Sequence, residues 1–102
     1  IETVAVMLGS KWVIVLLRDM FMGKVHFNEF LRQNPKLSNK VLHQKLHEMQ
    51  EYGLIKRYVG DKVEYRLTKK GEMLRPVLRS MIEYGSNFCE NKDYALQLKR
   101  CC

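Results

Sequence analysis

Five side chains that can donate hydrogen bonds lie close together in one stretch of the sequence. They follow one another at spacings of one and three residues, which would place them on one face of a helix: Asn39, Lys40, His43, Gln44 and His47. Amide, ammonium and imidazole groups presented together suit the base edges in the major groove of DNA. A solvated helix face without a partner is the simpler alternative.

The other side of this stretch must hold the helix on a core. Leu42, Leu46 and Met49 recur at helical spacing and are expected to face inward. Ser38 can accept a hydrogen bond from a free N–H of the first turn, and Gly53 suits the left-handed conformation that ends many helices. These signals predict a recognition helix over about residues 38–52.

A shorter helix is expected just before it. Residues 27–33 can turn Phe27, Phe30 and Leu31 inward, and Pro35 cannot continue a helix, so a turn over residues 34–37 follows. A short helix, a tight turn and a second helix with a polar outer face make a helix-turn-helix.

The most apolar segment, residues 11–22, is expected to be the most buried helix. Ser10 can cap its start, and Gly23 can take the left-handed conformation at its end. Arg18 and Asp19 are expected to mark a wetter edge of this helix.

A β-hairpin is predicted after the recognition helix. Residues 54–67 form two β-rich runs around Gly60-Asp61, which suits a type II′ turn. The pairing that follows from this turn places Arg57 opposite Glu64, a favourable cross-strand pair. It also gathers a core-facing set on one side of the hairpin: Leu54, Tyr58, Val63, Tyr65 and Leu67. Residues 25–27 can pair as an edge strand.

A long apolar helix is expected over about residues 69–90, capped by Thr68. Pro76 implies either a bend within it or the start of its regular part. With the apolar segment 1–8, this is more apolar surface than a small domain needs, which favours self-association. The alternative is that both segments fold onto the same monomer. The predicted dimer interface consists of Val4, Met7, Leu8, Leu78, Met81, Ile82 and Phe88.

Composition limits the function. A chain of 102 residues has room for one modest core, and its net charge of +7 favours an acidic partner such as nucleic acid. The longest apolar run, residues 12–17, is too short to span a bilayer. Cys89, Cys101 and Cys102 are odd in number and gathered at one end, so a reducing cytoplasm with free thiols is expected.

Enzyme and metal chemistry find little support. His43 and His47 stand one turn apart, but no further zinc ligand accompanies them, so no metal site is predicted. The acidic residues are scattered, and neither a phosphate-binding loop nor a nucleophile motif is present. Cys101-Cys102 is expected to be a pair of terminal thiols without a role. The chain is therefore predicted to be no enzyme and to need no cofactor.

Several motifs resemble the HxlR-type branch of the MarR-like regulators. In this order, they are Gly9-Ser10-Lys11-Trp12, Phe27-Asn28-Glu29-Phe30, Ser38-Asn39-Lys40-Val41-Leu42, Tyr52-Gly53-Leu54-Ile55, Val63-Glu64-Tyr65-Arg66-Leu67-Thr68, and Gly71 with Leu74-Arg75-Pro76-Val77-Leu78. The resemblance covers nearly the whole chain. It implies a homodimeric, sequence-specific DNA-binding transcription regulator of bacteria or archaea, dimerised through its first and last helices.

Two departures from the family pattern concern the wing and the effector. The hairpin around Gly60-Asp61 is a few residues shorter than the family's wing and lacks its prolines, and Ser10 stands where glycine is usual. Many members carry Cys-Pro just before the position of Ile1, and in some that cysteine senses electrophiles or oxidants. Those positions lie outside the given sequence, so a small-molecule or redox effector stays unassigned.

The predicted fold class is α+β, mainly α: one winged helix-turn-helix domain over residues 1–102, with the wing at about 54–67. Double-stranded operator DNA, a second copy of the chain and no membrane are the expected partners, in the cytoplasm. The predicted DNA-binding residues are Ser38, Asn39, Lys40, His43, Gln44, His47, Lys36, Arg57 and Lys62. A protein-interaction module and an RNA-binding winged helix are the alternatives.

Overall fold

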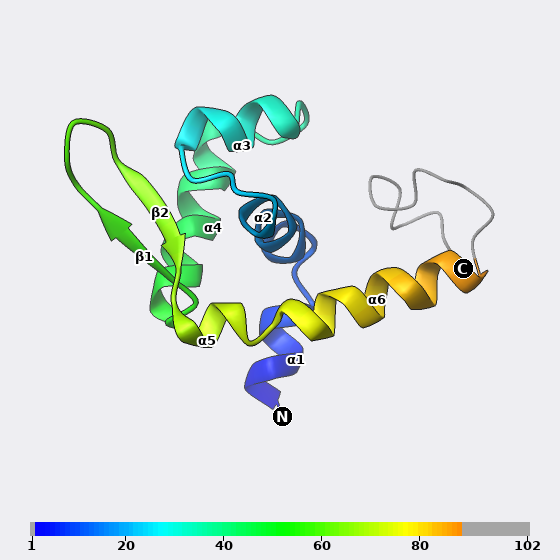
Figure 1. Cartoon of the computed structure of the whole chain (residues 1–102). Helices are drawn as coiled ribbons and strands as arrows, with labels where there is room; N and C mark the ends of the chain where they lie inside the picture. The colour runs from blue at the N-terminus through cyan, green and yellow to red at the C-terminus, as the bar shows by residue number, and fades with distance from the viewer. Residues whose placement is uncertain (1, 89–102) are drawn as a thin grey trace. The chain divides into compact units, whose positions relative to one another are not determined.

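The computed structural model describes the backbone of residues 2–88 and the side chains of residues 4–85. The chain divides into two compact units, Ile1–Glu72 and Met73–Cys102. In the first unit the elements follow in the order α1 (Glu2–Leu8), α2 (Lys11–Phe21), α3 (Phe27–Gln33), α4 (Asn39–Glu51), β1 (Ile55–Tyr58), β2 (Glu64–Leu67) and α5 (Lys69–Glu72). The second unit holds α6 (Arg75–Phe88), and Figure 1 shows all eight elements. This mainly helical fold with one small sheet is a winged helix-turn-helix.

The core of the first unit is built from the apolar sides of α2, α3 and α4. Phe30 and Leu42 are completely buried, as are two leucines of α2, Leu16 and Leu17. Leu46 and Met49 continue the buried side of α4, as their spacing predicted. Full burial of one such side chain stabilises a fold by about 1.5–3 kcal/mol, so this cluster holds α4 in place.

Glycines end two of the helices in the same way. Gly23 after α2 and Gly53 after α4 have positive φ, at 94° and 77°. The N–H of the next residue reaches back to the carbonyl five positions earlier, from Lys24 to Asp19 and from Leu54 to Met49. Both ends are therefore Schellman caps, in which the left-handed conformation favours a residue without Cβ.

The hairpin differs from its predicted register by one residue. Arg57 lies opposite Tyr65, and Glu64 lies opposite Tyr58, so the predicted Arg57–Glu64 pair is wrong. Gly60 does not have the positive φ of a type II′ turn, because residues 59–63 form a longer connection. The shift turns Tyr58 away from the core, where it is half exposed. Ile55 and Tyr65 are the buried side chains of the two strands.

Three smaller expectations also change. Residues 25–27 form no strand of the described two-stranded sheet, although Tyr65 N–H donates to the Val25 carbonyl at 2.8 Å. Ser10 stands at the N-cap of α2, but its side chain makes no capping hydrogen bond. Asp19, expected at a wetter edge, is fully buried because it has polar partners that the helical pattern does not show.

Pro76 stands in the first turn of α6. Residues 73–74 form a turn between α5 and α6. Pro76 therefore marks the start of the regular helix and not a bend within it. This agrees with the tolerance of proline in a first turn, where its missing N–H costs nothing. Thr68 precedes α5, and its Oγ1 accepts a hydrogen bond from Gly71 N–H at 3.2 Å.

Candidate nucleic-acid interface

All nine residues predicted to contact DNA have exposed side chains. Five of them lie on α4, at positions 39, 40, 43, 44 and 47, on the side opposite the buried Leu42, Leu46 and Met49. The helix therefore has an anchored side and a polar outer side, hereafter the polar face of α4. Lys36 lies in the turn before the helix, and Arg57 and Lys62 lie on the hairpin.

Ser38 caps α4 as predicted. Its Oγ accepts a hydrogen bond from Val41 N–H at 3.1 Å. The N–H groups of Asn39 and Lys40 belong to the first turn, where a helix leaves its backbone donors without intrahelical partners. Free N–H groups and the helix dipole favour an anion at such an end, and Lys36 adds a positive charge beside it in the sequence.

Two of the histidines on the polar face contact other side chains. The ring of His43 lies 4.4 Å, centroid to centroid, from the ring of Phe27, the first residue of α3. His47 Nε2 lies 3.4 Å from Glu51 Oε1, and this contact is an ion pair only when the histidine is protonated. Both members of the second contact are exposed, so its contribution to stability is small. Among the residues described, no group of three His, Cys, Asp or Glu could hold a metal ion.

A buried polar network connects α2 to the turn of the helix-turn-helix. Asp19 Oδ2 accepts a hydrogen bond from Asn34 Nδ2 at 2.8 Å, and Asp19 Oδ1 forms a 2.8 Å ion pair with Arg18 Nη2. The same Asn34 amide donates to the Phe30 carbonyl at 2.9 Å and so closes the end of α3. Sequence reasoning missed this network. Its one signal in the sequence is the adjacent Arg18 and Asp19 after the apolar run of this helix.

Glu29 fixes the start of α3. Its Oε1 accepts hydrogen bonds from the backbone N–H groups of Val25, at 3.0 Å, and His26, at 2.9 Å. These two donors, with smaller contributions from the nearby His26 and Lys24 charges, lower the pKa of this carboxyl below its ordinary value of 4.5. The His26 ring in turn contacts the Val63 carbonyl through Nδ1 at 3.2 Å, which connects the start of α3 to the hairpin.

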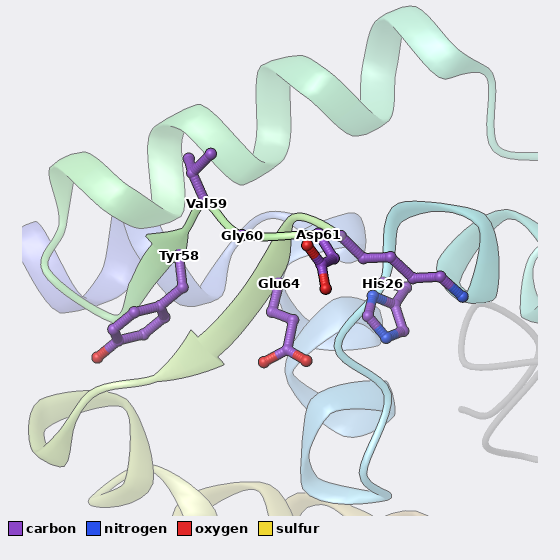
Figure 2. Close-up of a pocket in the computed structure, with 7 residues that line it drawn as sticks. His26, Tyr58, Val59, Gly60, Asp61 and Glu64 are labelled. Atoms are coloured by element: carbon purple, nitrogen blue, oxygen red, sulfur yellow. The ribbon is translucent and has the colours of Figure 1, made fainter.

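An open pocket of about 430 Å³ lies at the end of the hairpin (Figure 2). Acidic, basic and imidazole groups line it together, among them Asp61, Lys62, Glu64 and His26. Glu64 is also paired with Arg66, whose Nε lies 2.8 Å from its Oε1. The pocket thus presents mixed charge, while Arg57 and Lys62 remain exposed at the hairpin surface.

The predicted dimer-interface residues differ in exposure. Val4 and Met81 are exposed, by 45% and 40%, Leu8 and Ile82 are partly buried, and Met7 and Leu78 are buried within the single chain. The side chain of Phe88 lies outside those described. Four large apolar side chains of the second unit are exposed at spacings of three and four residues: Met73, Val77, Met81 and Tyr84.

No helix in the described part of the chain combines the length and the apolar character that a membrane span requires.

Comparison with known proteins finds a matching family and similar relatives. The model of the HxlR-like helix-turn-helix family matches residues 7–93. The HTH-type transcriptional regulator YdeP of Bacillus subtilis is 36% identical over 97 residues, which cover 91% of this chain and 76% of YdeP.

Two solved structures are similar in both sequence and fold. The redox regulator HypR in its oxidised form is 36% identical, with a TM-score of 0.78 over 84% of this chain and 93% of that chain. The transcriptional regulator YodB of B. subtilis in its reduced form is 30% identical, with a TM-score of 0.78 over 87% of this chain and 91% of that chain. YdeP and YodB are thus transcriptional regulators, and HypR is a redox regulator.

Proposed function

We propose that this chain, which belongs to the HxlR-like helix-turn-helix family of transcriptional regulators, binds specific double-stranded DNA as a homodimer. The observation that carries the proposal is the polar face of α4: exposed amide, ammonium and imidazole groups on a helix whose other side is fully anchored. A rigid helix with an exposed hydrogen-bonding side fits the major groove of B-DNA, where each base pair presents a distinct pattern of donors and acceptors.

Base contacts and phosphate contacts are assigned to different residues. Asn39, His43 and Gln44 near the start of α4 would meet base edges, as the first turns of a recognition helix do, and Lys40 would bind a nearby phosphate. Ser38 and the free N–H groups behind it would hold a phosphate.

The remaining cations fix the register of the protein on the duplex. Lys36 in the turn and Arg57 and Lys62 on the hairpin would bind phosphates, with His47 at the outer end of the polar face. The longer hairpin connection leaves Lys62 exposed, which supports a phosphate contact for it.

The second copy would be bound through apolar side chains of α1 and α6. In the second unit, Met73 just before α6 and Val77, Met81 and Tyr84 on α6 are exposed at spacings of three and four residues, unlike the scattered apolar residues of an ordinary monomer surface, and in the first unit Val4 is exposed on α1. Two identical patches related by a two-fold axis can cover one another. Sedimentation equilibrium tests this: Met81→Glu should shift the protein to monomer, and Ser80→Glu, also exposed on α6, should not.

Selection of bound sequences from a random duplex library tests the proposal as a whole. Wild-type protein should enrich a sequence with two related half-sites, because a two-fold symmetric dimer reads the same half-site twice. Enrichment of no sequence, with tight binding to structured RNA, would favour the RNA-binding alternative. Enrichment of no sequence and binding to neither nucleic acid at moderate salt would favour the protein-interaction alternative.

A further inference from the structure

Building on the function proposed above, we propose that Phe27 holds His43 in the orientation from which its imidazole reads a base edge. Phe27 would then set sequence preference at one base position without touching DNA. Its role would be that of a positioning residue, and His43 would be the residue that contacts the base.

The contact joins the two helices of the helix-turn-helix. Phe27 is the first residue of α3 and is half-buried, and His43 is exposed in the second turn of α4. Their ring centroids lie 4.4 Å apart, with the ring planes inclined by 35°. Aromatic rings at this separation attract one another beyond the area they bury, so the pair favours one side-chain conformation of His43.

The contact leaves the chemistry of the imidazole free. Ring packing uses the faces of the two rings, whereas the nitrogens of His43 donate or accept in the ring plane. Neither nitrogen has a hydrogen-bond partner among the residues described. A neutral imidazole offers one donor and one acceptor, and base edges in the major groove offer the matching groups. An exposed histidine without a neighbour would distribute itself over several rotamers, and only some of them would reach a given base.

Anchoring the helices does not require this pair. Phe30, one turn further along α3, is completely buried and supplies the aromatic side chain of the core. Phe27 lies at the rim instead, and His43 lies on the polar face of α4, away from Leu42 and Leu46. A contact between a rim residue and an exposed donor contributes more to the placement of that donor than to the core.

The experiment compares base preferences of variants on the sequence that the wild-type protein selects. Binding is measured by fluorescence anisotropy on a set of duplexes that carry each base at each position. His43→Ala should lose preference at one position of the half-site. Phe27→Leu, which keeps an apolar side chain but removes the ring, should weaken preference at the same position by about twofold to tenfold.

Three comparisons separate positioning from general structure. The double variant Phe27→Leu with His43→Ala should discriminate no less than His43→Ala alone, because the ring acts only through the histidine. Phe27→Tyr, which keeps the ring, should retain the wild-type preference. Phe27→Leu combined with Gln44→Ala should show additive losses at two different positions, since Gln44 would read its own base and would not act through the ring.

Two results would overturn the inference and leave the proposed function intact. One is a Phe27→Leu protein that weakens binding to all duplexes equally, because that is the mark of a structural role. The other is a His43→Ala protein with an unchanged preference at every position. A wild-type protein that selects no sequence would instead remove the proposed function itself.

Discussion

Asn34 donates a hydrogen bond from Nδ2 to Asp19 Oδ2 at 2.8 Å, and so attaches the turn of the helix-turn-helix to a fully buried carboxylate of α2. A charge removed from water costs several kcal/mol unless it is paired and hydrogen-bonded, and Arg18 completes the pairing at 2.8 Å. The network therefore fixes where α4 begins relative to α2, and with it the direction of the polar face.

Replacement of Asp19 by alanine should destabilise the protein by about 3 kcal/mol. The variant leaves the Asn34 amide without this acceptor and removes one of the partners of Arg18, which is partly exposed and whose Nη2 also lies 3.5 Å from Asn34 Oδ1. Urea denaturation followed by circular dichroism measures the change. Asn28→Ala, at an exposed position of α3, is the control and should lower the free energy of unfolding far less. Equal losses in the two variants would contradict the role given to the network.

Gly71→Ala should be strongly destabilising, by about 1–3 kcal/mol. A Cβ at this position would lie only 2.2 Å from the Leu54 carbonyl oxygen, which is backbone and cannot move aside cheaply. Gly60 offers a matched control, because a Cβ there meets no atom within 4 Å. Thermal denaturation of Gly71→Ala and Gly60→Ala should therefore differ clearly, and similar melting temperatures would refute the close approach of α5 to Leu54.

Ser38→Ala should cost about 1 kcal/mol, because the Val41 N–H loses the hydroxyl that accepts its hydrogen bond. Ser10→Ala is the natural comparison: Ser10 occupies the same position at α2 without a side-chain capping bond, so its replacement should cost less. Chemical denaturation of both variants in parallel measures the two free energies of unfolding. A decrease for Ser10→Ala as large as that for Ser38→Ala would contradict the role of Ser38 as a cap.

Glu29 should contribute to the acid sensitivity of folding. Backbone N–H groups of Val25 and His26 depress its pKa in the folded protein, so the unfolded chain binds a proton more readily than the folded chain. The contribution is present above the ordinary value of 4.5 and is lost as pH falls through the lower folded value. Glu29→Gln, which cannot titrate, should flatten the fall of unfolding free energy below that pH. An unchanged pH profile would exclude this contribution.

Lys40→Ala should reduce the salt dependence of DNA binding. Loss of one phosphate contact lowers the slope of log K against log salt by about 0.9. Lys45→Ala removes the same charge from the same helix, but Lys45 is paired with Glu48 at 3.1 Å and lies away from the polar face. Titrations from low to moderate salt should show the smaller slope for Lys40→Ala alone. Identical slopes in both variants would mean that Lys40 makes no contact with phosphate.

The helices of the first unit follow from local signals in the sequence. Helix α3 has its predicted bounds, Phe27–Gln33, because apolar spacing and the following Pro35 both act within a few residues. The Ser38 cap and the glycine ends at Gly23 and Gly53 are equally local, since each depends on the backbone next to it. The exposed polar face of α4 then follows from the same spacing that buries Leu42 and Leu46.

Contacts between distant residues were decided only by the tertiary structure. The hairpin register depends on how residues 59–63 cross between the strands, and a shift of one residue turned Tyr58 outward. The burial of Asp19 is accompanied by a hydrogen bond from Asn34, fifteen positions away, and the ring beside His43 is that of Phe27, from the preceding helix. Spacing along one helix predicts which side of it is apolar. It carries no information about which polar partner another element supplies, because that depends on how the elements pack.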